Sequence, residues 1–340
     1  MTKSTVVVTV DVEDFFLPRP PVDTVLAQWG GVGYGVPRIM DILEDHGARG
    51  TFFVDVYNRV TLDEGLLREA CQEIDRRGHE VGLHTHPAFP SGRRGYGMEQ
   101  VLSRYDLAWQ TDFIRQGRDM ITSWIGRPPR SHRAGGYGAN LDTLRALAAC
   151  QITIDSSLLT GYALCGLNGL LSSNNTPSRL ESMLEIPISV TRTSYKARVM
   201  GRQWALLAMT KKVDPDWAGL FELKQQILAL RNSGLTPLVI MLHSYALLDV
   251  GRSFRPVLEA EKKFRDLISW LSAQKDLVLS PLGQYVDRME SCPARIIKDS
   301  IPEVEIFVDQ FDRQTLRWLA GRVQWSHAAL LLDWLKGQKR

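Results

Sequence analysis

The sequence lacks the features that would assign it to several large classes of protein. Its 340 residues hold only four cysteines, and none of them forms a CxxC pair, so we expect neither a disulfide scaffold nor a thiolate zinc site. It contains no run of about 18 uncharged apolar residues, which predicts no membrane span. Basic residues number 41 and acidic residues 38, a net charge of +3. So small an excess gives no electrostatic reason to expect binding to nucleic acid or to an anionic membrane.

The first residues also lack the pattern of an export signal. The stretch MTKSTVVVTVDVEDFF has a short apolar run that acidic residues interrupt at once, and it has no small-residue cleavage site. We therefore expect a cytoplasmic protein. Hydrophobic residues make up 44% and charged residues 23% of the chain, which is typical of a globular protein with a sizeable core.

Strand and helix patterns alternate along most of the chain. The β-branched run at 5–10 is typical of a buried strand, and a helical pattern follows it and stops at Gly47. This alternation predicts a parallel β/α architecture over residues 1–290. The alternation stops after that point, and we expect residues 291–340 to form a C-terminal helical extension. Further strands are predicted at TFFVDVY, HEVGLHTH, ITIDSS, MLEIPISV and LVIMLHSY.

Polar residues collect where the predicted strands end. In an α/β barrel, the carboxyl ends of the strands are where active sites form. We therefore treat these residues as candidates for one site. They are Asp11, Glu13 and Asp14 after the first strand, His84 and His86 in the third, Arg133 in a Gly-rich turn, Asp155 after the fourth, and His243 in a late strand.

The two histidines His84 and His86 are separated by one residue. Side chains two apart on a strand point to the same face, so both imidazoles can meet one ion. The pair alone is equally compatible with a strand that carries histidines for packing. His79 lies an odd number of residues from His84, and we expect it to pack or to bond the backbone.

Three acids in four residues end a strand that should be buried. Buried carboxylates are unfavourable unless they are paired or bound to metal. Asp11 and Glu13 share a face by the period of two, so we expect Glu13 as a metal ligand and Asp11 as a base beside it. Asp14 is the alternative ligand if the strand ends earlier. Two histidines and one carboxylate leave room for water, as in open zinc sites and in the facial triad of ferrous enzymes.

In their order and spacing, the motifs DVED, HTH, RAGGYG, DSS and LHS resemble those of the polysaccharide deacetylase family, the carbohydrate esterases related to chitooligosaccharide deacetylase. The stretch GARGTFFV resembles the second-strand signature of that family, and the likeness spans about residues 5–290. The resemblance implies a distorted (β/α) barrel and metal-dependent removal of acetyl groups from N-acetylated sugars. This chain has one residue instead of three between its histidines and no proline after Arg133, features of a divergent branch.

The resemblance also implies a role for each candidate residue. Asp11 matches the general base, Arg133 the arginine that orients it, and His243 the general acid. Asp155 matches the acid of the fourth motif, where it would raise the pKa of His243. The implied cofactor is a divalent metal, with Zn²⁺ expected and Co²⁺, Ni²⁺ or Fe²⁺ as alternatives. The metal ligands that the resemblance implies are Glu13, His84 and His86.

The sequence thus predicts a hydrolase that removes an acetyl group from an N-acetylated sugar or a glycan precursor. Two other functions are compatible with the same residues: hydrolysis of a cyclic amide on the same fold, and sugar binding by a non-catalytic pseudoenzyme. The presence of both a base, Asp11, and an acid, His243, favours catalysis, because binding alone needs neither.

Overall fold

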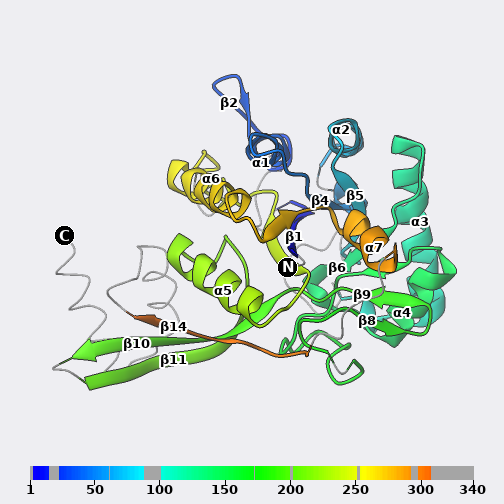
Figure 1. The fold of residues 1–340 in the computed structure, drawn as a ribbon. Coiled ribbons are helices and arrows are strands. Elements are labelled where there is room, and N and C mark those ends of the chain that lie inside the picture. Colours follow the sequence, from blue (N-terminus) through cyan, green and yellow to red (C-terminus); the bar gives the residue numbers. More distant parts are fainter. Residues whose placement is uncertain are drawn as a thin grey trace.

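The computed structural model describes residues 3–14, 23–60, 62–87, 101–171, 173–199, 202–250, 253–291 and 298–307, and every structural statement below concerns these residues. A curled sheet of nine strands forms the centre of the molecule (Figure 1). Its strands are β1 (Ser4–Val12), β4 (Thr51–Asp55), β5 (Glu80–Thr85), β6 (Ser131–Ala134), β7 (Ile154–Asp155), β8 (Ser178–Leu180), β9 (Met183–Glu185), β12 (Leu238–His243) and β13 (Leu277–Leu279).

The strands of this sheet follow the order β12-β1-β4-β5-β6-β7-β9-β8, and β13 also pairs with β1. The pairs are parallel except for β8 with β9. Both faces of β1 are covered, so Val6, Val7 and Val8 are all fully buried and the strand shows no alternation of polarity. This burial explains why the first strand reads as a continuous β-branched run.

Irregular chain completes the sheet between β7 and β12. The N–H of Ile188 donates to the carbonyl of Leu158 at 3.0 Å, and the N–H of Ser189 donates to the carbonyl of Val239 in β12 at 3.3 Å. The N–H of Val239 donates in return to the hydroxyl of Ser189 at 2.8 Å. The predicted fold class, a distorted (β/α) barrel, is confirmed.

Helices cover the outside of the sheet (Figure 1). Their sequences show apolar residues at helical spacing and recognisable starts; Asp63, for example, caps α2 by accepting the N–H of Leu66 at 3.3 Å. No helix in the described part of the chain is long and apolar enough to cross a membrane. The helices are α1 (Val36–Glu44), α2 (Glu64–Arg76), α3 (Leu107–Ile125), α4 (Leu141–Ala149), α5 (Leu220–Asn232), α6 (Leu258–Ser272) and α7 (Leu282–Ser291), with short 3₁₀ turns η1 (Val56–Val60), η4 (Leu102–Arg104) and η5 (Gly135–Tyr137).

A second sheet projects from the barrel as an arm (Figure 1). It consists of β10 (Val190–Val199), β11 (Arg202–Lys212) and β14 (Glu303–Phe307). β10 pairs with β11 in antiparallel and with β14 in parallel orientation. A small hairpin, β2 (Gln28–Trp29) with β3 (Val32–Gly33), completes the strands.

The structure differs from the sequence-based expectation near the C-terminus. Residues 303–307 form a strand instead of a helix, because Val304 and Ile306 are buried while Glu303 and Glu305 are exposed, a period of two. The rest of the predicted helical extension, residues 308–340, lies outside the described residues and stays a prediction. The stretch after β13 is helix α7.

Candidate metal centre

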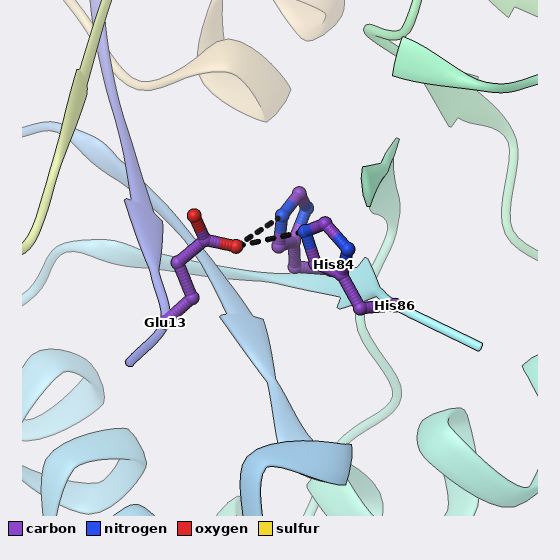
Figure 2. Close-up of side chains that lie close together, drawn as sticks. All are labelled: Glu13, His84 and His86. Carbon is purple, nitrogen blue, oxygen red and sulfur yellow. Dashed lines mark ion pairs between the residues drawn. The ribbon is translucent and has the colours of Figure 1, made fainter. Parts of the chain in front are cut away.

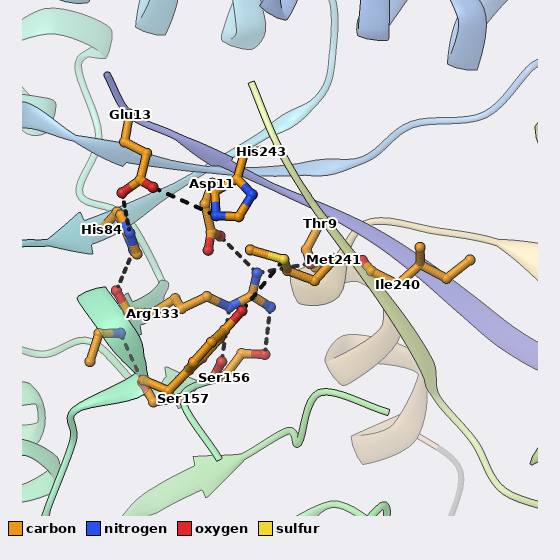
Figure 3. Close-up of polar contacts among 12 residues, drawn as sticks. Thr9, Asp11, Glu13, His84, Arg133, Ser156, Ser157, Ile240, Met241 and His243 are labelled. Carbon is orange, nitrogen blue, oxygen red and sulfur yellow. Dashed lines mark hydrogen bonds and ion pairs between the residues drawn. The ribbon is translucent and has the colours of Figure 1, made fainter. Parts of the chain in front are cut away.

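The register of neighbouring strands brings the candidate residues to one end of the barrel. Asp11 of β1 lies opposite His243 of β12. His84 of β5 lies opposite Arg133 of β6. Residues in register on neighbouring strands point to the same face, so side chains that are far apart in the sequence converge inside the barrel. Figure 3 shows this convergence around Asp11, Arg133 and His243.

Glu13, His84 and His86 form the candidate metal triad. Their ligand atoms all lie within 4.8 Å of one another, and all three residues are buried. Oε2 of Glu13 is 3.3 Å from Nε2 of His84 and 2.8 Å from Nε2 of His86 (Figure 2). Asp14, the alternative carboxylate ligand, does not belong to this group of ligand atoms. Its Oδ1 accepts a hydrogen bond from the hydroxyl of Thr24 at 3.4 Å.

The tautomer of His84 is fixed by the backbone. Its Nδ1 is 2.8 Å from the carbonyl oxygen of Arg133, which can only accept, so Nδ1 carries a proton. In the neutral ring, Nε2 then offers a lone pair toward Glu13. A hydrogen bond to the ring nitrogen that does not bind the metal orients metal-binding histidines in this way.

A divalent cation fits this centre. Oε2 of Glu13 is buried and has no partner in the described part of the chain other than the two imidazole nitrogens. A lone pair on His84 that faces a carboxylate oxygen is repulsive unless a proton or a cation lies between them. Two imidazole nitrogens and one carboxylate oxygen are the donor set that Zn²⁺ and related ions bind. The residues present therefore suit the ion.

The charged groups of the triad shift one another's pKa values. Burial would raise the pKa of Glu13, but the imidazoles of His86 and His84 hold it well below its ordinary value. Burial would lower the pKa of His84, but Asp11 and Glu13 raise it. The site therefore favours a carboxylate facing positive charge.

Asp11 is held by Arg133 beside the triad. Oδ1 of Asp11 accepts a hydrogen bond from Nη1 of Arg133 at 2.8 Å, and both side chains are buried. Burial would raise the pKa of Asp11, but the Arg133 guanidinium, with His84 and His243, lowers it below its ordinary value. Asp11 is therefore ionised, as a base must be before it accepts a proton.

Arg133 itself is fixed on every side. Nη1 also donates to the hydroxyl of Thr9 at 2.9 Å, Nη2 donates to the hydroxyl of Ser156 at 3.0 Å, and Nε donates to the carbonyl of Ser156 at 2.9 Å. Its guanidinium lies 4.4 Å above the centre of the Phe53 ring. A side chain held this way positions Asp11 with little freedom.

The partner of His243 is Asp216, which sequence reasoning missed. Nδ1 of His243 is 2.7 Å from Oδ2 of Asp216, and its Nε2 lies 3.6 Å from Oε1 of Glu13. Burial would lower the pKa of His243, but Asp216 and Glu13 raise it to about 9. The only signal was an acidic pair in VDPDWAG, just before α5, which also suits the start of a helix.

Asp155 does not pair with His243, so that expectation is wrong. Asp155 lies in register with His132, and adjacent residues on a strand point to opposite faces, so it shares the face of His132 and not that of Arg133. Its Oδ1 is 2.7 Å from Nδ1 of His132. Burial would raise the pKa of Asp155, but His132 lowers it. A role for Asp155 in catalysis stays a prediction.

Comparison with known proteins agrees with this fold. Residues 29–154 match the model of the polysaccharide deacetylase family, a segment that includes His84, His86 and Arg133. Comparison with curated proteins found no match. A Mycobacterium smegmatis protein designated a polysaccharide deacetylase superposes with a TM-score of 0.55 at 19% identity, covering 89% of this chain and 96% of that one.

Two further solved structures are similar at lower scores. The peptidoglycan deacetylase PdaC of Bacillus subtilis has a TM-score of 0.43 at 16% identity, covering 85% of this chain and 93% of its own. A family 4 carbohydrate esterase of Streptomyces lividans, solved with acetate, has a TM-score of 0.43 at 13% identity, covering 82% and 93%. The superposition on the Mycobacterium smegmatis protein shows that the two chains share a fold. The family match confirms the predicted resemblance to the polysaccharide deacetylases.

Proposed function

We propose that this protein is a metal-dependent hydrolase that removes an acetyl group from an N-acetylated sugar or a glycan precursor. The observation that carries the proposal is the meeting of a candidate metal triad, the ionised Asp11 and the histidine His243 at one end of the barrel. We also propose Zn²⁺ as the ion and the cytoplasm as the location.

The triad supplies the place for the ion. Glu13, His84 and His86 would hold it, with His84 kept in the ligating tautomer by the carbonyl of Arg133. A divalent cation there would activate water and polarise the acetyl carbonyl. The charge of the ion would also be partly balanced by Glu13.

Asp11 suits the role of general base. Its carboxylate is ionised and buried, and Arg133 fixes its direction through a hydrogen bond of 2.8 Å. It would accept a proton from the attacking water. The bonds that hold Arg133 would keep this geometry during the proposed reaction.

His243 suits the role of general acid. With a pKa raised to about 9 by Asp216 and Glu13 against the effect of burial, the ring is protonated at neutral pH. Asp216 holds Nδ1, so Nε2 carries the proton on the side of the metal centre. An amide nitrogen leaves poorly without a proton, and His243 would supply it.

Metal content and acetate release test the proposal together. Purified protein loaded with Zn²⁺ should hold a single equivalent and should release acetate from N-acetylated mono- and oligosaccharides. Asp11→Asn should keep the metal and lower turnover on the order of 10²- to 10⁴-fold, because only the base is lost. His86→Ala should lose the metal.

Two results would contradict the proposal. Metal-loaded wild-type protein that binds N-acetylated sugars without releasing acetate would be a pseudoenzyme. Protein that retains no Zn²⁺ or Co²⁺ would have no metal centre, and cyclic amides would be the next substrates to assay.

A further inference from the structure

Asp55 lies at the metal centre but has no role in the proposed reaction. It is the last residue of β4, is fully buried, and is in register with His84. Val54 of β4 is in register with Val12, which places Glu13 beside Asp55 on the neighbouring strand. Glu13, Asp55 and His84 therefore occupy one row across three strands and point to the same face.

The carboxylate of Asp55 is only half satisfied by hydrogen bonds. Its Oδ1 accepts the N–H of Tyr57 at 3.0 Å. Its Oδ2 is buried and has no hydrogen-bond partner in the described part of the chain. A buried polar atom without a partner destabilises the folded state, so its presence calls for a compensating interaction.

The charged groups around Asp55 are those of the triad. Without a cation, burial and the Glu13 carboxylate raise the pKa of Asp55 well above its ordinary value, while His86 acts in the opposite direction. A divalent ion held by the triad would lower this pKa and favour the ionised carboxylate. Glu13 balances one charge of a divalent ion, and the charge of Asp11 is already balanced by Arg133. One more positive charge of the ion is left to balance inside the barrel.

We propose that Asp55 is a positioning residue of the metal centre, an outer carboxylate that stands behind the triad, balances the remaining charge of the bound ion and steadies His86 as a ligand. Asp55 is not a ligand itself, because the ligand atoms that lie within 4.8 Å of one another belong to Glu13, His84 and His86. This inference rests on the proposed function, because it requires that the triad binds a metal.

The test measures metal affinity and not activity. Wild-type protein and Asp55→Asn are titrated with Zn²⁺ in competition with a chromophoric chelator. Asn keeps the size of the side chain and the acceptor for Tyr57 but removes the charge. The affinity should fall by about 10- to 100-fold, as it does when outer partners of metal ligands are removed. Thermal unfolding without metal checks that the variant folds, and Asp55→Ser is the second variant if it does not.

Glu185→Gln is the matched control. Glu185 of β9 is also a fully buried carboxylate whose Oε2 has no hydrogen-bond partner in the described residues. It is in register with Asp155, on the face away from the triad. Its substitution should leave the affinity for Zn²⁺ unchanged.

The possible outcomes separate the two proposals. Wild-type protein without Zn²⁺ binding would contradict the proposed function. Equal affinities of wild type and Asp55→Asn would overturn only the role of Asp55. The visible spectrum of bound Co²⁺ should be the same in both proteins, and a changed spectrum would make Asp55 a direct ligand and overturn its outer position.

Discussion

At the scale of single residues, Gly135 packs directly against the imidazole of His86. A Cβ at this position would lie 2.5 Å from Cγ, Nδ1 and Cε1 of His86, closer than real contacts allow. The ring can therefore reach Glu13 only because residue 135 has no side chain. The Gly-rich turn after Arg133 thus serves the metal centre as well as the turn itself.

Gly135→Ala should weaken the metal centre without changing any ligand. The added methyl group must push the His86 ring away from Glu13, and we expect affinity for Zn²⁺ to fall by at least about 10-fold, the size seen for lost ligand support. Chelator competition measures this change. The control uses the free energy of unfolding without metal, because a His86→Ala background binds no ion. Gly135→Ala should lower this free energy in the wild type, but in the His86→Ala background the methyl group meets no ring and should have little further effect. Equal losses in both backgrounds would show that the turn, and not His86, requires glycine.

The sequence predicts which side chains lie together where spacing on one strand decides the matter. The period of two places His84 and His86 together, and it selects Glu13 over Asp14, in agreement with the structure. It cannot show which strand stands next to which. The partner of His243 therefore had to come from the structure, where Asp216 occupies a loop that follows the arm.

At the scale of elements, His79 joins α1 to the sheet. Its Nδ1 accepts the N–H of Gly50 at 3.1 Å, so its Nε2 carries the proton and donates to Oε1 of Glu44 at 2.9 Å. The expectation that His79 bonds the backbone is confirmed. Burial lowers the pKa of His79 to about 4. Burial would raise the pKa of Glu44, but Arg77 and His79 lower it to about 2.

These pKa values predict a loss of stability in acid. Both folded pKa values lie below the ordinary ones of 6.5 for His79 and 4.5 for Glu44, so the unfolded chain binds more protons than the folded one. The contribution of His79 to stability is full above pH 6.5 and is lost between pH 6.5 and about 4, by up to about 1.4 kcal/mol per pH unit. The contribution of Glu44 to stability is lost in the same way between pH 4.5 and about 2.

Urea unfolding at a series of pH values measures this slope. His79→Gln should flatten the curve between pH 6.5 and 4, since glutamine takes up no proton. Glu44→Gln should remove the loss that lies below pH 4.5. A curve for His79→Gln as steep as that of the wild type would assign the acid loss to other groups.

The strands differ in how clearly the sequence predicts them. Strands of the barrel are buried on both faces and read as apolar runs, so β1, β4 and β12 were predictable. β11 was not, because WALLAM is apolar at consecutive positions while the strand is partly exposed at the edge of the arm. Its structure depends on pairing with β10, which the local sequence does not show.

At the scale of the whole molecule, the arm joins the barrel through a buried ion pair under α5. Nζ of Lys211 in β11 donates to Oε1 of Glu222 in α5 at 2.7 Å and to the hydroxyl of Tyr195 in β10 at 2.9 Å. The Tyr195 hydroxyl donates in turn to Glu222 at 2.8 Å. All three side chains are buried. Helix α5 and two strands of the arm therefore share one buried polar contact.

Removing one charge of this contact should destabilise the protein strongly. Lys211→Met leaves the Glu222 carboxylate buried without its cation, and we expect a loss of about 3–5 kcal/mol in the free energy of unfolding, measured in urea. The double variant Lys211→Met with Glu222→Leu leaves no buried charge and should recover most of that loss. Zn²⁺ affinity of the folded variants should stay unchanged, because the triad lies at the ends of β1 and β5 and not in the arm. A single variant as stable as the double one would mean that water reaches Glu222 and that the arm is held by apolar packing alone.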